Sequence, residues 1–348
     1  MISFTMIKTL SDYSPYLLVT LMIWIGIPNK NIAQEFNPDP NLSKVVYPHV
    51  EWVKSWPSAD NKPQKKKFKD RFNSIVFGTK IPVLSNPISV YADNADVFWV
   101  LDQGNKTVFQ IQEGVGDIPH SILKTDFNLS SLVGICSGSN SSILFTDSRA
   151  QKIYRISKEK NRLECLNDTL VLEQPTGIAF SRLKKEIWVV ETKAHRIAIL
   201  NENGDLIKRI GTRGNLPGEY NYPTHIWIDN KGYVYITDAM NFRIQVLNAE
   251  GEIISVFGET GDVSGYFARP KGIATDTFGN VYVVDALFHA VQVFDIKGNF
   301  LYKFGNQGHG KGEFWMPSGI YIDALNTIYV ADTYNSRIQV FKLIYTEN

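Results

Sequence analysis

A short phrase recurs three times in this chain and sets the strongest limit on its fold. It reads YVYITDAMNFRIQVL at residues 233–247, YVVDALFHAVQVF at 282–294 and YVADTYNSRIQVF at 329–341. The acidic residue of the phrase recurs every 47 residues, and weaker copies continue upstream at a similar spacing. The acidic residues of the six copies are Asp102, Asp147, Glu191, Asp238, Asp285 and Asp332. A period in the forties predicts a propeller or another repeat array.

Each repeat has the pattern of four short strands. Residues 270–305 contain the runs KGIATD, VYVVDA, AVQVFD and FLYKFG, which are rich in Val, Ile, Tyr and Phe and are separated by Gly and Asn turn signals. The turn DIKGN places Gly where a hairpin needs a positive φ, so neighbouring strands should pair antiparallel. Such a four-stranded blade cannot bury both of its faces alone, which favours a closed ring of blades.

The ends of the chain indicate how the ring closes. Only five residues follow Leu343, so the sixth blade lacks an outer strand. The segment FNSIVFG, Phe72–Gly78, resembles the outer strand that begins at Phe300, and we expect it to complete the last blade. Closure also covers sheet edges that an open array would expose. The sequence therefore predicts an all-β, six-bladed propeller of four-stranded antiparallel blades over residues 67–348, closed by an N-terminal strand.

The N-terminus has the features of an export signal. Lys8 precedes an apolar core of twelve residues, Tyr16–Ile27, which is shorter than the ~20 residues of a membrane span. We expect residues 1–33 to be a signal peptide cleaved after Ala33, and residues 34–66 to be an extended Pro-rich leader. The mature chain would then be periplasmic or extracellular, with no integral membrane span. The alternative is an uncleaved segment that keeps the protein at the membrane.

Charge and cysteines exclude some functions. The net charge is +1 and charged residues make up 20% of the chain, so the protein as a whole has no strong positive potential to attract nucleic acid, and we expect no nucleic-acid partner.

The two cysteines are expected on different strands of one blade. Cys136 is expected on the innermost strand of the second blade and Cys165 on its outermost strand. Three strand spacings, or ~14 Å, would separate them. A disulfide needs Cα atoms within ~7 Å, so both thiols should be free.

Two long segments resemble a known repeat. RPKGIATDTFGNVYVVDALFHAVQVFDIKGNFLYKFGNQGHGKGEFWMP and MPSGIYIDALNTIYVADTYNSRIQVF are similar to the NHL repeat. The resemblance is close over Pro175–Leu343 and loose over Leu84–Asp168. The stretch SWPSADNKPQKKKFKDRFNSIVFG also resembles the N-terminal approach of exported bacterial NHL propellers, some of which are encoded beside multihaem cytochromes. The resemblance implies a six-bladed propeller but no single activity, because one fold hosts many functions.

The repeated acidic residue is followed five positions later by an arginine in three copies. The pairs are Glu191 with Arg196, Asp238 with Arg243, and Asp332 with Arg337. A residue that recurs once per blade favours a structural role, namely to hold the loop between the second and third strands. An electrostatic binding site is the alternative. In the fifth blade Ala290 stands in place of the arginine, so the pair is dispensable there.

Histidines are the candidate metal ligands. His195 and His289 occupy the same position in blades three and five, and His225 replaces a glycine at the start of an inner strand. We expect these three and His309 to lie on one face of the ring, where imidazoles can bind Zn²⁺.

Relatives with NHL-like propellers include a lyase that cleaves peptidyl-hydroxyglycines, whose zinc is held by histidines from alternating blades. The spacing of His195 and His289 resembles that arrangement, but the third position here is Lys106, which is not a zinc ligand. The alternative is that these histidines are polar loop residues.

Aromatic residues recur in the Gly-rich loops between blades. They are Tyr220, Tyr222, Tyr266, Phe267, Phe314 and Trp315. We expect these side chains to cap the packing between blades, and any that are exposed to anchor a binding face.

These observations favour a protein-interaction scaffold in the cell envelope, beside redox proteins if the family resemblance is followed. No G-x-S-x-G, P-loop or H-E-x-x-H motif occurs, and we predict no catalytic residue and no cofactor. The alternative is a metal-dependent propeller enzyme, similar to the lyase or to a lactonase, which would hold Zn²⁺ or Ca²⁺ at the axial mouth.

Overall fold

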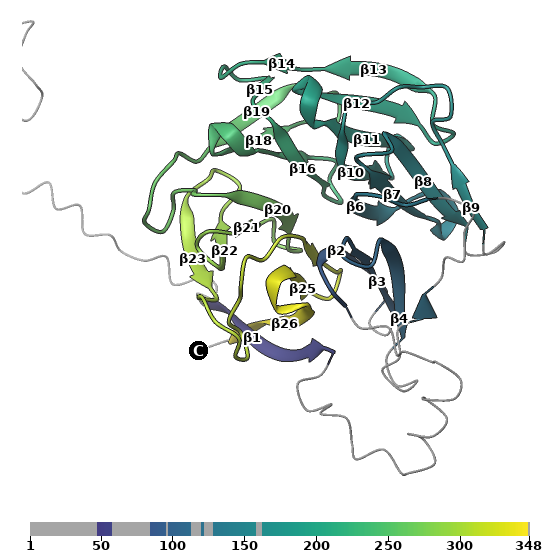
Figure 1. Cartoon of the computed structure of the whole chain (residues 1–348). Coiled ribbons are helices and arrows are strands. Elements are labelled where there is room, and N and C mark those ends of the chain that lie inside the picture. The colour runs from purple at the N-terminus through teal and green to yellow at the C-terminus, as the bar shows by residue number, and fades with distance from the viewer. Residues whose placement is uncertain are drawn as a thin grey trace, which may run out of the picture. The chain divides into compact units, whose positions relative to one another are not determined.

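The computed structural model describes residues 47–57, 84–94, 97–112, 120–121, 128–157 and 162–346. Pro48–Tyr345 form one compact unit. Its strands build six four-stranded sheets, which follow one another around a ring (Figure 1). This confirms the predicted all-β, six-bladed propeller. The expected signal peptide lies outside the described residues, and no described helix is long and apolar enough to cross a membrane.

The blades follow the chain in order, and each begins with its innermost strand. Blade 1 holds β2 (Pro87–Asn94), β3 (Val97–Asp102), β4 (Thr107–Gln112) and β5 (His120–Ser121). Blade 2 holds β6 (Leu132–Ser137), β7 (Ile143–Asp147), β8 (Lys152–Ser157) and β9 (Arg162–Cys165). Blade 3 holds β10 (Pro175–Ser181), β11 (Glu186–Glu191), β12 (Arg196–Asn201) and β13 (Leu206–Ile210).

The second half of the ring repeats this order. Blade 4 holds β16 (Pro223–Ile228), β17 (Val234–Asp238), β18 (Arg243–Leu247) and β19 (Ile253–Phe257). Blade 5 holds β20 (Pro270–Thr275), β21 (Val281–Asp285), β22 (Ala290–Phe294) and β23 (Phe300–Phe304). Blade 6 holds β24 (Ile320–Ile322), β25 (Thr327–Asp332), β26 (Arg337–Thr346) and β1 (Tyr47–Trp56). Two short strands, β14 (Thr212–Arg213) and β15 (Glu219–Tyr220), pair in the loop before blade 4.

Local sequence explains the strands and their turns. In blade 5, every residue of β21 and β22 is buried, as the Val-rich runs predict. The turn to β23 is held by Asp295, whose Oδ1 accepts the N–H groups of Lys297 and Asn299 at 2.9 Å. Gly298 has φ +87°, a conformation that only glycine adopts without strain. The predicted DIKGN hairpin is therefore confirmed.

Glycines bring neighbouring blades into main-chain contact near the axis. Four blades carry a glycine at one shared position of the inner chain: Gly134, Gly177 and Gly272 lie in β6, β10 and β20, and Gly319 directly precedes β24. A Cβ added at these positions would lie 2.5 to 2.8 Å from main-chain atoms of the next blade. No side chain fits there, so the glycines let the inner strands approach closely and form a narrow waist in the central channel.

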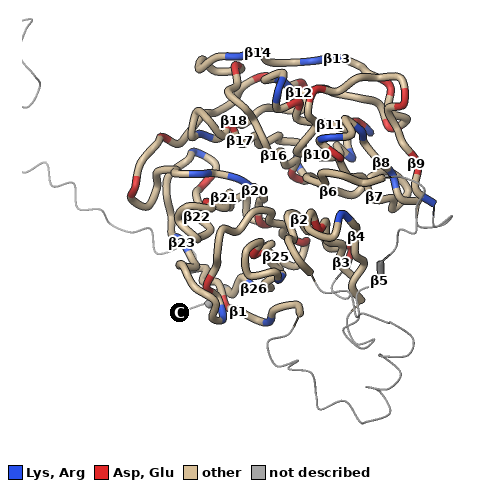
Figure 2. The backbone as a smooth tube through the Cα atoms, viewed as in Figure 1, with Lys and Arg blue, Asp and Glu red and all other residues tan. Residues whose placement is uncertain are grey.

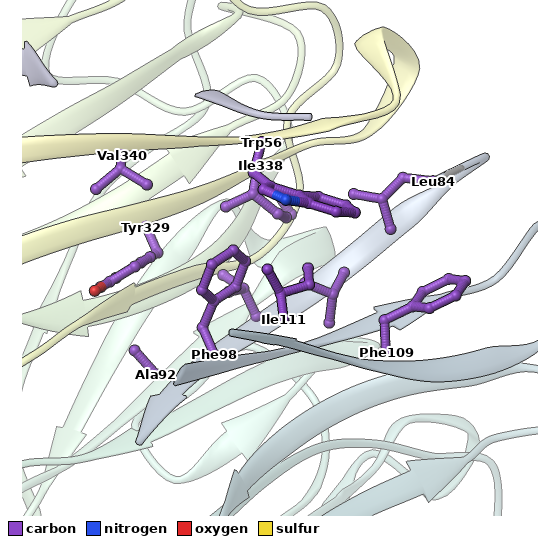
Figure 3. Packing of buried hydrophobic residues seen from close by; sticks show 12 residues of the cluster. Trp56, Leu84, Ala92, Phe98, Phe109, Ile111, Tyr329, Ile338 and Val340 are labelled. Carbon is purple, nitrogen blue, oxygen red and sulfur yellow. The ribbon is translucent and has the colours of Figure 1, made fainter. Parts of the chain in front are cut away.

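An N-terminal strand completes the last blade, as predicted, but it is a different segment from the expected one. Strand β1 lies next to β26 in the order β1-β26-β25-β24. Trp52 Nε1 donates to Oε1 of Gln339 at 2.9 Å, and Trp56 packs against Phe98 of blade 1 in the seam between the last and first blades (Figure 3). Strand β1 falls within the expected leader, 34–66, whereas Phe72–Gly78 lies outside the described residues.

The two ends of the strands define two faces of the ring. We call the end with the turns between first and second strands, and between third and fourth strands, the hairpin face. We call the opposite end, with the loops between second and third strands and the segments that connect blades, the interblade face. Lys, Arg, Asp and Glu are interspersed around the ring rather than gathered by sign (Figure 2).

Candidate functional site

The repeated acidic residues are buried anchors on the interblade face. Asp238 Oδ1 accepts the N–H of Asn221, in the segment that enters blade 4, at 2.6 Å, and Oδ2 accepts Nε of Arg243 at 2.8 Å. Arg243 in turn donates to the carbonyl oxygens of Leu216 and Glu219. The pair therefore holds the incoming interblade segment as well as the loop between the second and third strands.

The other predicted pairs form the same contact. The distance from Arg337 Nε to Asp332 Oδ2 is 2.7 Å, and that from Arg196 Nε to Glu191 Oε2 is 2.8 Å. Burial opposes ionisation of Glu191, but hydrogen bonds from Arg196 and Arg209 outweigh it and hold the pKa of this carboxyl below its usual value. Both oxygens of each carboxylate are thus engaged inside the protein.

Blade 5 shows what the carboxylate does without its arginine. Asp285 accepts main-chain N–H groups from Ala268 at 2.8 Å, Arg269 at 3.0 Å and Leu287 at 3.1 Å. The fully buried Ala290 takes the place of the arginine. The hydrogen bonds of the carboxylate to the loops are therefore the common element of the six blades.

His195 and His289 use their imidazoles to join neighbouring blades. Nδ1 of His195 accepts the N–H of Tyr222 at 3.1 Å, and Nδ1 of His289 accepts the N–H of Met316 at 3.0 Å. Each donor lies in the segment that enters the next blade. Both histidines adopt a left-handed backbone conformation, with φ of 54° and 53°. One ring nitrogen of each histidine is therefore occupied by a main-chain group.

The two remaining candidates lie in different surroundings. His225 stands on the innermost strand of blade 4 at the waist, where burial and the charge of Lys271 lower its pKa to about 3. Its Nε2 has no hydrogen-bond partner among the described residues. His309 Nδ1 lies 2.6 Å from Oδ1 of Asn335, and its ring packs edge-on against Trp315.

The described residues contain no group of three or more His, Cys, Asp and Glu side chains placed to hold a metal ion. The enzyme alternative with Zn²⁺ or Ca²⁺ stays a prediction that no described contact favours. Both cysteines are free, as expected from their strands.

The six predicted aromatic residues divide into two sets. Tyr220, Phe267 and Phe314 are fully buried. Each ring covers a glycine at the end of the preceding outer strand, and a Cβ at Gly211, Gly258 or Gly305 would lie 2.4 Å from it. Tyr222, Tyr266 and Trp315 are exposed by 43%, 41% and 40%. Only this second set is available to a partner.

Further exposed apolar residues surround these three on the interblade face. Tyr334, Met240 and Leu287, each two positions after the repeated aspartate, are exposed by 64%, 54% and 52%. None of the three was predicted from the sequence, although the repeat register distinguishes them: the same position in blades 1 to 3 holds Gly104, Arg149 and Lys193. We call the set Leu216, Tyr222, Met240, Val263, Tyr266, Leu287, Trp315 and Tyr334 the apolar interblade patch. It lies on blades 4 to 6 and the segments that enter them, whereas the segment that enters blade 3 exposes one large apolar residue, Val171.

A central cavity lies on the other side of the waist. Its volume is about 510 Å³, and its lining extends from the waist glycines and His225 to the turns of the hairpin face. No residue of the described interblade segments lines it. The cavity therefore opens on the face opposite to His195, His289 and the apolar interblade patch.

Comparisons with known proteins agree with this architecture. A family model described as a 6-bladed beta-propeller of the domain of unknown function DUF5128 matches residues 162–257, and a model of the NHL repeat matches residues 314–341. No curated protein sequence matches the chain.

Solved structures show the same fold at low identity. A virginiamycin B lyase from Staphylococcus aureus is 18% identical with a TM-score of 0.54, covering 75% of this chain and 96% of the lyase. An auxiliary nutrient binding protein from Bacteroides thetaiotaomicron is 14% identical with a TM-score of 0.60, covering 76% of this chain and 70% of that one. A gluconolactonase from Xanthomonas campestris is 14% identical with a TM-score of 0.57, covering 75% and 87%. The repeat register, the six sheets and the match to a 6-bladed propeller model together identify this chain as a six-bladed β-propeller, of which residues 314–341 match the NHL repeat.

Proposed function

We propose that this protein is an exported propeller that binds a protein partner through the apolar interblade patch. The observation that carries the proposal is the presence of eight exposed apolar side chains on the interblade face of three consecutive blades. Large exposed apolar patches mark interaction surfaces on soluble proteins. The export signal expected in residues 1–33 would place this surface in the cell envelope.

The residue types in the patch suit a protein interface. Tyr, Trp and Met are enriched in interface cores, and Trp and Tyr dominate interface hot spots. The ring centroids of Trp315 and Tyr334 lie 6.3 Å apart, and those of Trp315 and His309 lie 4.9 Å apart. Tyr222 packs edge-on against His195 at 4.4 Å. Because these side chains are already held, binding would cost little side-chain entropy.

The charges around the patch do not select a strongly charged partner. Exposed Arg213, Glu259, Asp262 and Lys311 lie in the same interblade segments, so both signs are present. We therefore expect an envelope protein that presents apolar side chains, rather than a polyanion such as nucleic acid. A location beside redox proteins rests on the family resemblance alone.

The test compares the two faces of the ring. Trp315→Ser and Tyr334→Ser change the patch, and Phe278→Ser changes an aromatic residue on the hairpin face whose exposure, 60%, is close to the 64% of Tyr334. Each variant is used with the wild type to retain partners from an envelope extract of the source cells. We expect one protein to be retained by wild type and Phe278→Ser but lost with the two patch variants. Equal retention by all four proteins would refute the proposal.

Self-association is a separate outcome, because a second copy can also cover the patch. Light scattering on the purified wild type and on Tyr334→Ser gives the oligomeric state directly. A dimer that the variant converts to a monomer would show that the patch joins copies of this chain and would replace the proposal of a different partner.

A further inference from the structure

We propose that the central cavity binds a small organic monocarboxylate. In this arrangement the carboxylate lies at Arg182, and the apolar body of the ligand packs on a wall formed by Tyr91, Trp227 and Tyr321. The site opens on the hairpin face, so it is independent of the protein-binding surface proposed above.

One position on the innermost strand of each blade determines the shape of the cavity. The residue at this position pairs with the residue of the second strand that lies three positions before the repeated acid. From blade 1 to blade 6 it is Tyr91, Cys136, Ala179, Trp227, Ala274 and Tyr321. Tyr321 contacts Tyr91 edge-on at 5.0 Å and Trp227 at 5.7 Å, so the three large rings form one wall. The small side chains of blades 2 and 3 leave open volume opposite this wall. At about 510 Å³ the cavity has the size of a small-molecule site, typically about 300–1,000 Å³.

Arg182 provides an anion anchor at the rim of the cavity. It follows β10, lines the cavity, and forms no hydrogen bond or ion pair with any described residue. A guanidinium presents a planar fork of donors that matches a carboxylate. An unpaired guanidinium beside an apolar wall is therefore available to a ligand.

Two phenol groups complete the anchor. Arg182 is close enough to act electrostatically on the hydroxyls of both Tyr91 and Tyr321. Burial nevertheless raises the pKa of Tyr91 to about 12 and also raises that of Tyr321, so both hydroxyls keep their protons. The hydroxyl of Tyr91 is also hydrogen-bonded to the side chain of Ser137, which acts to lower its pKa, and a phenol that accepts this bond can still donate its own proton to a ligand. The hydroxyl of Tyr321 has no hydrogen-bond partner within the described part of the chain.

Acidic residues at the mouth set a limit on ligand charge. Asp93, Asp229, Asp276 and Asp323 line the cavity, and Lys231 is the second cation of its described lining. Asp229 and Asp276 already accept hydrogen bonds within the protein. Asp229 accepts the N–H of Lys231 and the hydroxyl of Tyr235, and Asp276 accepts the N–H of Phe278 and the hydroxyl of Tyr282. Their charges still oppose a second negative charge on the ligand. A monocarboxylate therefore fits better than a dicarboxylate.

The test measures binding by titration calorimetry at neutral pH with four probes of one size class: benzoate, phthalate, benzamide and benzylamine. We expect benzoate to bind, and the other three probes to bind at least about tenfold more weakly. Benzamide and benzylamine lack the carboxylate that forms the charge-assisted hydrogen bond with Arg182, and the second negative charge of phthalate is repelled by the acidic residues of the lining. Arg182→Met should weaken benzoate binding about tenfold or more, and Tyr321→Phe several-fold.

Lys184→Met is the matched control, since Lys184 lies in the same turn but outside the cavity and pairs with Glu250 at 3.1 Å. Its affinity for benzoate should equal that of the wild type, and thermal melts establish that every variant is folded. Absence of benzoate binding at millimolar concentration would overturn the proposal. So would tighter binding of benzylamine, which would assign the cavity to cations, or equal loss of affinity in Arg182→Met and Lys184→Met.

Discussion

His289 Nδ1 accepts the main-chain N–H of Met316 over 3.0 Å and so joins the fifth blade to the segment that enters the sixth. His195 and Tyr222 repeat this contact between the third and fourth blades. The imidazole acts here as an interblade link.

Replacing His289 by alanine should destabilise the ring by about 1–2 kcal/mol, because the N–H of Met316 loses its acceptor. Chemical denaturation of wild type and variant measures this loss. Elemental analysis of the same two samples tests the metal alternative: we expect equal metal content in both. About one zinc per chain in the wild type, absent from the variant, would instead favour the enzyme.

Asp238→Ala should cost more stability than Arg243→Ala. Removing the carboxylate leaves the largely buried guanidinium of Arg243 without its counter-charge and the N–H of Asn221 without its acceptor, for which about 3–5 kcal/mol is typical. Removing the arginine leaves a carboxylate that still accepts the N–H of Asn221 and the side-chain amides of Asn241 and Gln245, so we expect about 1–3 kcal/mol. Denaturant unfolding measures the free energy of unfolding of both variants and shows which of the two is less stable. The reverse order would mean that the ion pair matters more than the hydrogen bonds to the loops.

His225 should make folding stability depend on pH. Its folded-state pKa of about 3 lies below the usual 6.5 of an imidazole, so the unfolded chain binds a proton more readily between these values. The neutral side chain is fully tolerated above about pH 6.5, and stability is lost as the pH falls toward 3. His225→Gly, which installs the residue of four other blades, should show a shallower loss over this range. Parallel pH profiles of wild type and variant would contradict this assignment.

Trp56→Ala should destabilise the ring by about 3–5 kcal/mol, because the side chain is buried in the seam between the last and first blades. Val53→Ala, on the exposed side of the same strand, serves as the control and should change stability by less than about 0.5 kcal/mol. Thermal unfolding of the two variants distinguishes them. Similar melting temperatures would show that β1 contributes little to closure.

The local sequence pattern predicts that a closing strand exists but does not predict which segment forms it. A missing outer strand was predictable from the end of the repeat, but two N-terminal segments have strand-like patterns. Residues 49, 51 and 53 are exposed and alternate with partly buried neighbours in β1, so the period of two was present in the sequence. What selects β1 is the contact of Trp52 with Gln339 and the packing of Trp56, which join residues almost 300 positions apart.

The aromatic residues of the interblade segments show the same limit. Tyr220 and Tyr222 are two positions apart and looked equivalent, yet one is fully buried and the other is 43% exposed. The difference arises because a glycine at the end of the preceding blade, Gly211, leaves room for the ring of Tyr220 alone.

The sequence by itself determined the repeat, the four strands of each blade, the glycine turns and the need for a closing strand, because these depend on residues that are near in the chain or one period apart. The tertiary structure decided the central cavity. Tyr91, Trp227 and Tyr321 share a repeat position but come from different blades, and only closure of the ring brings their rings into contact beside Arg182. Periodicity assigns a residue to a position within its blade, whereas the space around its side chain depends on side chains from the other five blades.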